Sequence, residues 1–139
     1  MNKFKAVLMS AVLVTAAAAH AEVVVVVSTK SPVNSLTKEQ VSDIFLGKAS
    51  TFPQGGQAVP IDLAAGAIHR EEFYNKVTGR SAAQLKSYWA KQSFSGKGTA
   101  PKAVAGDDEV KKLIAANPNT IGYIDKTRVD ASVRAVFTP

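Results

Sequence analysis

Apolar residues follow two patterns along the chain: short continuous runs, and stripes with the spacing of a helix. The run Val23–Val27 consists of five consecutive valines. Valine favours strands, and an apolar run without alternation is typical of a strand buried on both faces. An edge strand would carry polar residues at every second position, which this run does not. Shorter apolar runs at 58–62, 120–124 and 132–137 predict three further strands.

Two of the predicted helices begin with a capping box. Thr37 is followed three residues later by Gln40, and Ser81 is followed three residues later by Gln84. In a capping box the hydroxyl accepts a hydrogen bond from the first turn, while the glutamine side chain reaches back to the cap. We expect the first of these helices to end at Gly47. The inward-facing positions of the two helices are Val41, Ile44, Phe45, Leu85, Tyr88 and Trp89.

Two more helices are predicted between the strands. One covers 67–78 and ends at Gly79, and the other begins with Asp107 or Asp108 as its N-cap and stops before Pro118. Their inward-facing positions are Phe73, Tyr74, Val77, Val110, Leu113 and Ile114. Strands that alternate with helices are typical of an α/β fold. We therefore predict a single three-layer α/β lobe around a mixed, mostly parallel sheet.

The first 21 residues have the three parts of a secretory signal peptide. The basic leader MNKFK precedes the apolar run AVLMSAVLVTAAAA, and the small residues AHA precede a cleavage site. The alternative is a membrane anchor, which requires a longer apolar run. We expect a signal peptide at 1–21, cleavage after Ala21 and one domain at 22–139. The domain would then be periplasmic, with no membrane span after cleavage.

Charge and residue types limit the classes of ligand. The net charge is +6 at pH 7, and loss of Lys3 and Lys5 with the signal peptide lowers it to +4. A modest positive charge favours anionic ligands, but the basic residues form no tract of the kind that binds nucleic acid. The chain has no cysteine, and His69 is the one histidine outside the signal peptide. This composition argues against a zinc site, so we expect no metal and no cofactor.

The start of the helix at 67–78 is the first candidate site. The first backbone N–H groups of a helix have no partner within it, and the turn at 64–67 offers no Ser, Thr, Asp or Asn to cap them. Gly66 and Ala67 could therefore present N–H groups to an anion, while His69 and Arg70 add positive charge. The alternative is a solvated helix start, because two glutamates in the same turn can satisfy the helix dipole.

A Gly-rich loop is the second candidate site. Its residues are Ser95, Gly96, Lys97, Gly98 and Thr99. The glycines could expose N–H groups as an anion-binding nest, with the lysine supplying charge. The spacing is not that of a P-loop, and the alternative is a flexible surface turn. If both candidate loops lie at one edge of the sheet, they would flank a crevice at the strand ends.

Catalytic residues are not expected. A triad needs a nucleophile, a base and an orienting acid, and the domain has a single histidine and no G-x-S-x-G motif. Asp62 follows a strand as active-site carboxylates do, but it has no partner nearby in the sequence. We therefore predict that the protein is not an enzyme.

Four segments occur in an order that points to a known family. LTKEQVSDIFLGK is a helix that ends in an aromatic residue followed by Leu-Gly-Lys, and AVPIDLAAGAIHREEF is a strand, a turn and a helix. YWAKQSFSGKGTAPKAV and ANPNTIGYID follow. Together these segments resemble the substrate-binding proteins of phosphate ABC transporters. The resemblance implies the fold of one lobe of a type 2 periplasmic binding protein, whose full-length members close two lobes over phosphate.

The resemblance does not extend to the phosphate-binding side chains. The family carries Arg followed by Asp-Gly-Ser-Gly-Thr between strand and helix. In an alignment without gaps only Gly66 matches, because Ala65 replaces the acidic residue, and Ala67 and His69 replace the two hydroxyl residues. The resemblance therefore implies the backbone geometry of the site and not its side chains.

Two functions remain open from the sequence. One is a periplasmic module that binds phosphate or another small oxyanion and works with an ABC transporter permease or another envelope protein. The other is a single-lobe interaction or accessory module that has lost phosphate binding. A homodimer that rebuilds a two-walled cleft would combine the two.

Overall fold

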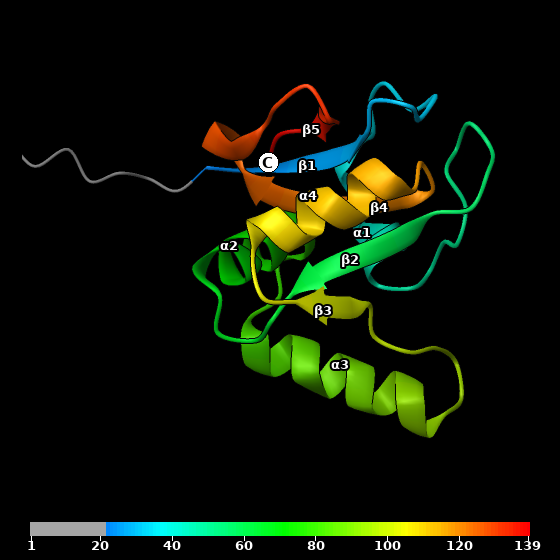
Figure 1. Ribbon diagram of the computed structural model, residues 1–139. Helices are drawn as coiled ribbons and strands as arrows, with labels where there is room; N and C mark the ends of the chain where they lie inside the picture. The colour runs from blue at the N-terminus through cyan, green and yellow to red at the C-terminus, as the bar shows by residue number, and fades with distance from the viewer. Residues whose placement is uncertain (1–21) are drawn as a thin grey trace, which may run out of the picture.

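The computed structural model describes residues 22–139, and the predicted signal peptide at 1–21 lies outside them. The centre of the fold is a five-stranded sheet with the order β3-β2-β4-β1-β5 (Figure 1). The strands are β1 (Val23–Ser28), β2 (Val59–Leu63), β3 (Lys102–Val104), β4 (Thr120–Asp125) and β5 (Val133–Phe137).

The strand directions place one set of strand ends together. β2 is parallel to both β3 and β4, and β1 is antiparallel to both β4 and β5. Four strands therefore run in one direction and β1 runs in the other. The carboxyl ends of β2, β3 and β4 share an edge, which we call the carboxyl edge. This arrangement confirms the predicted mixed, mostly parallel sheet.

The helices form the outer layers. They are α1 (Lys38–Phe45), α2 (Ile68–Thr78), α3 (Ala82–Phe94) and α4 (Asp107–Ala116), with a short 3-10 helix η1 (Lys126–Arg128) after β4. α4 lies across one face of the sheet, and α1 and α2 lie across the other (Figure 1). α3 lies outside these layers, alongside the edge strand β3 (Figure 1).

Two helix starts follow the sequence prediction, and a third does not. α1 and α3 each begin with the expected capping box, at Thr37 with Gln40 and at Ser81 with Gln84. The N-cap of α4 is Gly106, which has no side-chain cap, and the helix begins with Asp107 as its first residue. The prediction of an aspartate cap was therefore wrong, because the Asp107 Oδ2 atom accepts a hydrogen bond from the backbone N–H of Asp125 instead (3.1 Å).

The core confirms the apolar patterns. All six residues of β1 are buried, as the valine run predicted. Gly122 of β4 allows α4 to approach closely, since a Cβ atom at this position would lie 2.7 Å from Val110 Cγ1. The residue pattern missed β3, a strand of three residues whose first two are exposed. It also predicted that Tyr88 and Leu113 face the core, whereas both residues are half-buried.

Candidate functional site

The carboxyl edge contains the first predicted site. β2 ends at Leu63, and the turn that follows contains Gly66 with φ at +91°, a conformation that favours glycine. α2 begins after Ala67, whose extended backbone forms the N-cap without any side-chain hydrogen bond to the first turn. The helix start therefore has no side-chain cap, as the sequence predicted. The N–H of Ala67 is not free for an anion, because it donates to the carbonyl of Ala64 (3.2 Å), and the N–H of Arg70 donates to the carbonyl of Ala67 (3.1 Å).

A buried carboxylate anchors this region to the sheet. Asp62 is 3% exposed. Its Oδ2 atom accepts a hydrogen bond from the hydroxyl of Tyr74 in α2 (2.6 Å), and its Oδ1 atom accepts one from the hydroxyl of Tyr123 in β4. The backbone N–H of Leu63 also donates to Oδ1 (2.8 Å). These bonds satisfy the carboxylate with partners from three elements.

The two tyrosines remain donors throughout the physiological range. Burial raises the pKa of Tyr74 and of Tyr123 far above the ordinary tyrosine value, and the neighbouring charge of Asp62 raises both further. Protonated hydroxyls can only stabilise the carboxylate, so the cluster holds α2 against β4. Asp62 therefore has a structural role, and it does not contact a nucleophile or a base among the described residues.

Arg70 lies next to this cluster at the start of α2. Its Nε atom is 3.6 Å from Asp62 Oδ1, and its guanidinium carbon is 5.4 Å from the centre of the Tyr74 ring. The side chain is 17% exposed, and the buried Nε has no hydrogen-bond partner within residues 22–139. The guanidinium is thus held in place, while its hydrogen-bonding capacity is not used by the described part of the chain.

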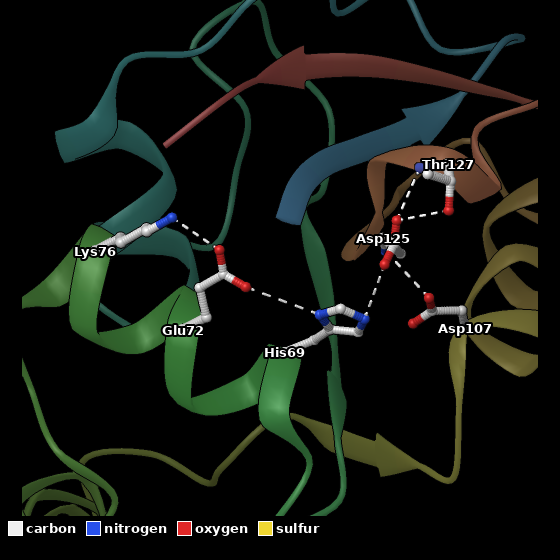
Figure 2. Close-up of polar contacts among 6 residues, drawn as sticks. All are labelled: His69, Glu72, Lys76, Asp107, Asp125 and Thr127. Atoms are coloured by element: carbon white, nitrogen blue, oxygen red, sulfur yellow. Dashed lines mark hydrogen bonds and ion pairs between the residues drawn. The ribbon is translucent and has the colours of Figure 1, made fainter. Parts of the chain in front are cut away.

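His69 connects the start of α2 to the end of β4 (Figure 2). Its Nε2 atom is 3.3 Å from Asp125 Oδ2, and its Nδ1 atom is 3.9 Å from Glu72 Oε2. Glu72 also forms an ion pair with Lys76 (2.7 Å). Hydrogen bonds from the side chain and the backbone of Thr127 lower the pKa of Asp125 below its ordinary value. Glu72 is therefore engaged by His69 and Lys76, whereas the acidic residue of the first turn is Glu71.

The second predicted site lies on the side of the amino ends of β2 and β3, opposite the carboxyl edge. The loop at 95–99 precedes β3, whose first residue, Lys102, pairs with Ile61, whereas the turn at Gly66 follows the carboxyl end of β2. The two loops therefore lie at opposite ends of the strands, so the condition for a crevice shared by Gly66 and the residues 95–99 is not met. Ligand binding by Ser95, Gly96, Lys97, Gly98 and Thr99 stays a prediction.

The backbone of this loop is partly used by α3. The N–H groups of Ser95, Gly96 and Lys97 donate to the carbonyls of Lys91, Ser93 and Gln92, at 3.0, 3.2 and 2.9 Å. Gly96 has φ at +70°, as expected for a glycine that ends a helix. Gly96, one of the two glycines that suggested an anion-binding nest, is therefore explained by the helix end.

Sequence reasoning missed the residues that complete the carboxyl edge. The sequence pattern places Tyr74 and Tyr123 in the apolar core. It contains no local signal that links them to Asp62, because Tyr74 is 12 positions away and Tyr123 is 61 positions away. Asp125 was not considered. Within residues 22–139 no cluster of His, Cys, Asp and Glu has the arrangement of a metal site. The same residues include no helix long and apolar enough to cross a membrane.

Comparisons with known proteins find similar solved structures, whereas no family model matches the sequence. One is a protein from Clostridium perfringens described as a phosphate ABC transporter substrate-binding protein with bound phosphate (27% identity, TM-score 0.66, 83% of this chain and 44% of that chain). Others are an ABC-type phosphate transport receptor from Vibrio cholerae (21%, 0.66, 83% and 45%) and PstS from Borrelia burgdorferi (13%, 0.60, 83% and 47%).

These matches concern the fold of part of larger proteins. The chain spans less than half the length of each, at 44%, 45% and 47%. The similar proteins are described as a substrate-binding protein and a transport receptor. The resemblance predicted from the sequence is confirmed by these structures: the chain has the α/β fold of one lobe of the substrate-binding proteins of phosphate ABC transporters.

Proposed function

We propose that the protein is an exported, periplasmic module that binds a small oxyanion such as phosphate at the start of α2. The observation that carries this proposal is the uncapped helix start next to Arg70, whose buried Nε has no hydrogen-bond partner in the described chain. The similar Clostridium perfringens protein was solved with phosphate bound. An ABC transporter permease is the partner class that the similarity suggests.

The expected affinity is low. A helix start contributes about 0.3–1 kcal/mol to anion binding, and a hydrogen bond from a charged group about 1.5–3 kcal/mol. One contact of each kind sums to about 2–4 kcal/mol, so the tightest dissociation constant expected is about 1 mM. Full-length relatives enclose their ligand between two lobes, and a single wall leaves the anion partly hydrated.

Isothermal titration with sodium phosphate and sodium sulfate at low ionic strength tests this function. We expect saturable binding at millimolar concentration, lost in Arg70→Ala. Lys76→Ala is the matched control, because Lys76 lies six residues after Arg70 on the same helix, pairs with Glu72 and has a side chain that is 51% exposed. Absence of heat and of thermal stabilisation with either anion would reject the proposal, as would equal loss in both variants.

Two exposed apolar side chains favour the interaction module as a second candidate. Ile68, the first residue of α2, is 75% exposed, and Phe94 at the end of α3 is 98% exposed. Single exposed apolar side chains are common on protein surfaces, but Ile68 lies at the proposed anion site and would be buried by a partner bound there. Sedimentation with and without phosphate, on the protein and on Ile68→Ser, measures whether a homodimer forms there. A monomer under all conditions would remove the homodimer.

A further inference from the structure

We propose that a groove between α3 and the turn after β2 binds a small amphipathic organic anion, with an apolar body and one carboxylate or phosphate group. The inference rests on the proposed function, because Arg70 supplies positive charge to both. It differs in the class of ligand, since the helix start alone recognises only an oxyanion. No sequence motif pointed to this groove.

The groove has the size of a small-molecule site. Its volume is about 510 Å³, within the range of about 300 to 1,000 Å³ that is common for such sites. Its lining comes from the turn after β2, from α2, from α3 and from the segment before β3. The lining residues are Ala65, Arg70, Ala82, Ala83, Lys86, Trp89 and Ala100.

The charges in the groove have a single sign. Arg70 and Lys86 are the two ionisable residues of the lining, and both are cationic. From 73 to 106, which includes all of α3, the chain contains six Lys and Arg residues and no Asp or Glu. Asp62 is the nearest carboxylate to Arg70, and two tyrosine hydroxyls already donate to it. Asp62 keeps its negative charge when the tyrosines donate to it and offsets part of the charge of Arg70, so the cation of the lining that forms no ion pair within residues 22–139 is Lys86.

The rest of the lining is apolar, which selects against a bare inorganic ion. Four alanines and the Trp89 ring provide no hydrogen bonds from their side chains apart from the indole N–H. A hydrated phosphate would lose water against these walls without compensation. A flat aromatic or short aliphatic body gains contact with Trp89 and the alanines, and its anionic group can then reach Arg70 and Lys86.

Trp89 makes the groove directly observable, because it is the single tryptophan of the chain. Titration with phenyl phosphate, benzoate and octanoate, excited at the red edge of tryptophan absorption, should change its fluorescence in a saturable way. Benzyl alcohol and octanol test the charge, and inorganic phosphate tests the apolar body. Free tryptophan amide corrects for absorption by the ligands.

The variants separate charge, shape and folding. We expect Arg70→Ala and Lys86→Ala each to weaken binding by about tenfold, the usual effect of losing one charged contact. Ala83→Leu keeps both charges and fills the groove, so it should abolish the fluorescence response. Lys91→Ala, on the same helix but outside the lining, should bind as the unaltered protein does. Circular dichroism confirms that each variant is folded.

The outcomes distinguish this inference from the proposed function. Binding of inorganic phosphate by calorimetry, with no fluorescence response to any organic anion, overturns the groove and leaves the oxyanion site. Equal responses to phenyl phosphate and benzyl alcohol overturn the role of charge. An unchanged response in Ala83→Leu or in Lys86→Ala places the ligand elsewhere and also overturns the inference. Absence of binding by both methods rejects both proposals.

Discussion

Two helices start at the carboxyl edge of the sheet, and their first turns differ in charge: that of α4 is acidic, whereas in that of α2 the charge of Arg70 balances the charge of Glu71. α2 follows β2 and α4 follows β3, and neither has a side-chain cap. The first turn of α4 contains three acidic residues, Asp107, Asp108 and Glu109. The first turn of α2 contains His69 and Arg70 along with Glu71. Carboxylates at a helix start compensate the dipole from within the chain, so the three acidic residues of α4 disfavour an anion more strongly than the single Glu71 of α2 does.

The helices are also anchored differently. α2 is tied to the sheet through the buried carboxylate of Asp62, which accepts from Tyr74 and Tyr123. α4 is tied through Asp107, a half-buried residue that accepts one backbone N–H from β4. A buried polar cluster fixes geometry closely, because any displaced member leaves an unpaired group. The α2 start is therefore the more rigidly positioned of the two.

The largest expected effect follows from removing the α2 anchor. Asp62→Ala leaves two buried hydroxyls without their acceptor and Arg70 without its counterion, and should lower the free energy of unfolding by about 3 kcal/mol or more. Asp107→Ala, the matched change at α4, should cost less than about 1 kcal/mol, since its backbone partner can turn to water. Urea denaturation followed by circular dichroism measures both. Similar losses in the two variants would show that the anchors are equivalent.

The packing of α4 provides the next effect. In Gly122→Ala the new methyl would lie 2.7 Å from Val110 and 3.0 Å from Ile114, so α4 must shift away from β4. We expect a loss of about 1–3 kcal/mol in stability with anion binding at α2 unchanged. Gly106→Ala is the control, because its added Cβ atom has no neighbour within 4 Å. A large loss of anion binding in Gly122→Ala would mean that the two starts are coupled.

A charge introduced at the N-cap of α2 should separate stability from binding. Ala67→Asp supplies the missing cap and should stabilise the protein by about 1 kcal/mol. Its carboxylate would occupy the position of the anion, so phosphate binding should be lost. Gly106→Asp makes the same change at α4 and should leave phosphate binding intact. Thermal denaturation with and without phosphate measures both effects, and retained binding in Ala67→Asp would place the anion elsewhere.

The sequence predicted those features whose partners lie close together along the chain. The capping boxes of α1 and α3 join residues three positions apart and were confirmed. The cap of α4 was mispredicted because the Asp107 carboxylate binds Asp125, 18 positions away. The same limit explains the candidate site. The uncapped turn is local and was predicted, whereas the partners of Asp62 lie in α2 and β4 and carry no signal near it.

The Gly-rich loop shows a second limit. Ser-Gly-Lys-Gly-Thr suits an anion-binding nest, and it equally suits the end of a helix followed by a turn. The structure uses it for the helix end, since the Lys97 N–H donates to Gln92 in α3. Composition alone cannot separate these uses, because the acceptor of each N–H depends on where the chain goes next. The sequence does not predict the groove at Trp89 for a related reason: its walls come from segments that are distant in sequence.

The smallest effect concerns Asp125, which contacts the starts of both helices. Its side chain lies 3.3 Å from His69 of α2, and its backbone N–H donates to Asp107 of α4. Hydrogen bonds from Thr127 hold its pKa below the ordinary value of 3.8. A lowered pKa in the folded state means that the carboxylate stabilises the protein above pH 3.8, and that this contribution disappears as the pH falls through the folded-state pKa. Asp125→Asn removes that titration, so the stability difference between the two proteins should be constant near neutral pH and should shrink in acid.

We expect this difference in the free energy of unfolding to be less than about 1 kcal/mol, because the His69–Asp125 pair is partly exposed. Urea denaturation of both proteins from pH 2 to pH 7 checks the sign, and a difference that grows in acid would contradict it, since it would mean that the carboxylate is bound more weakly in the folded protein than in the unfolded chain.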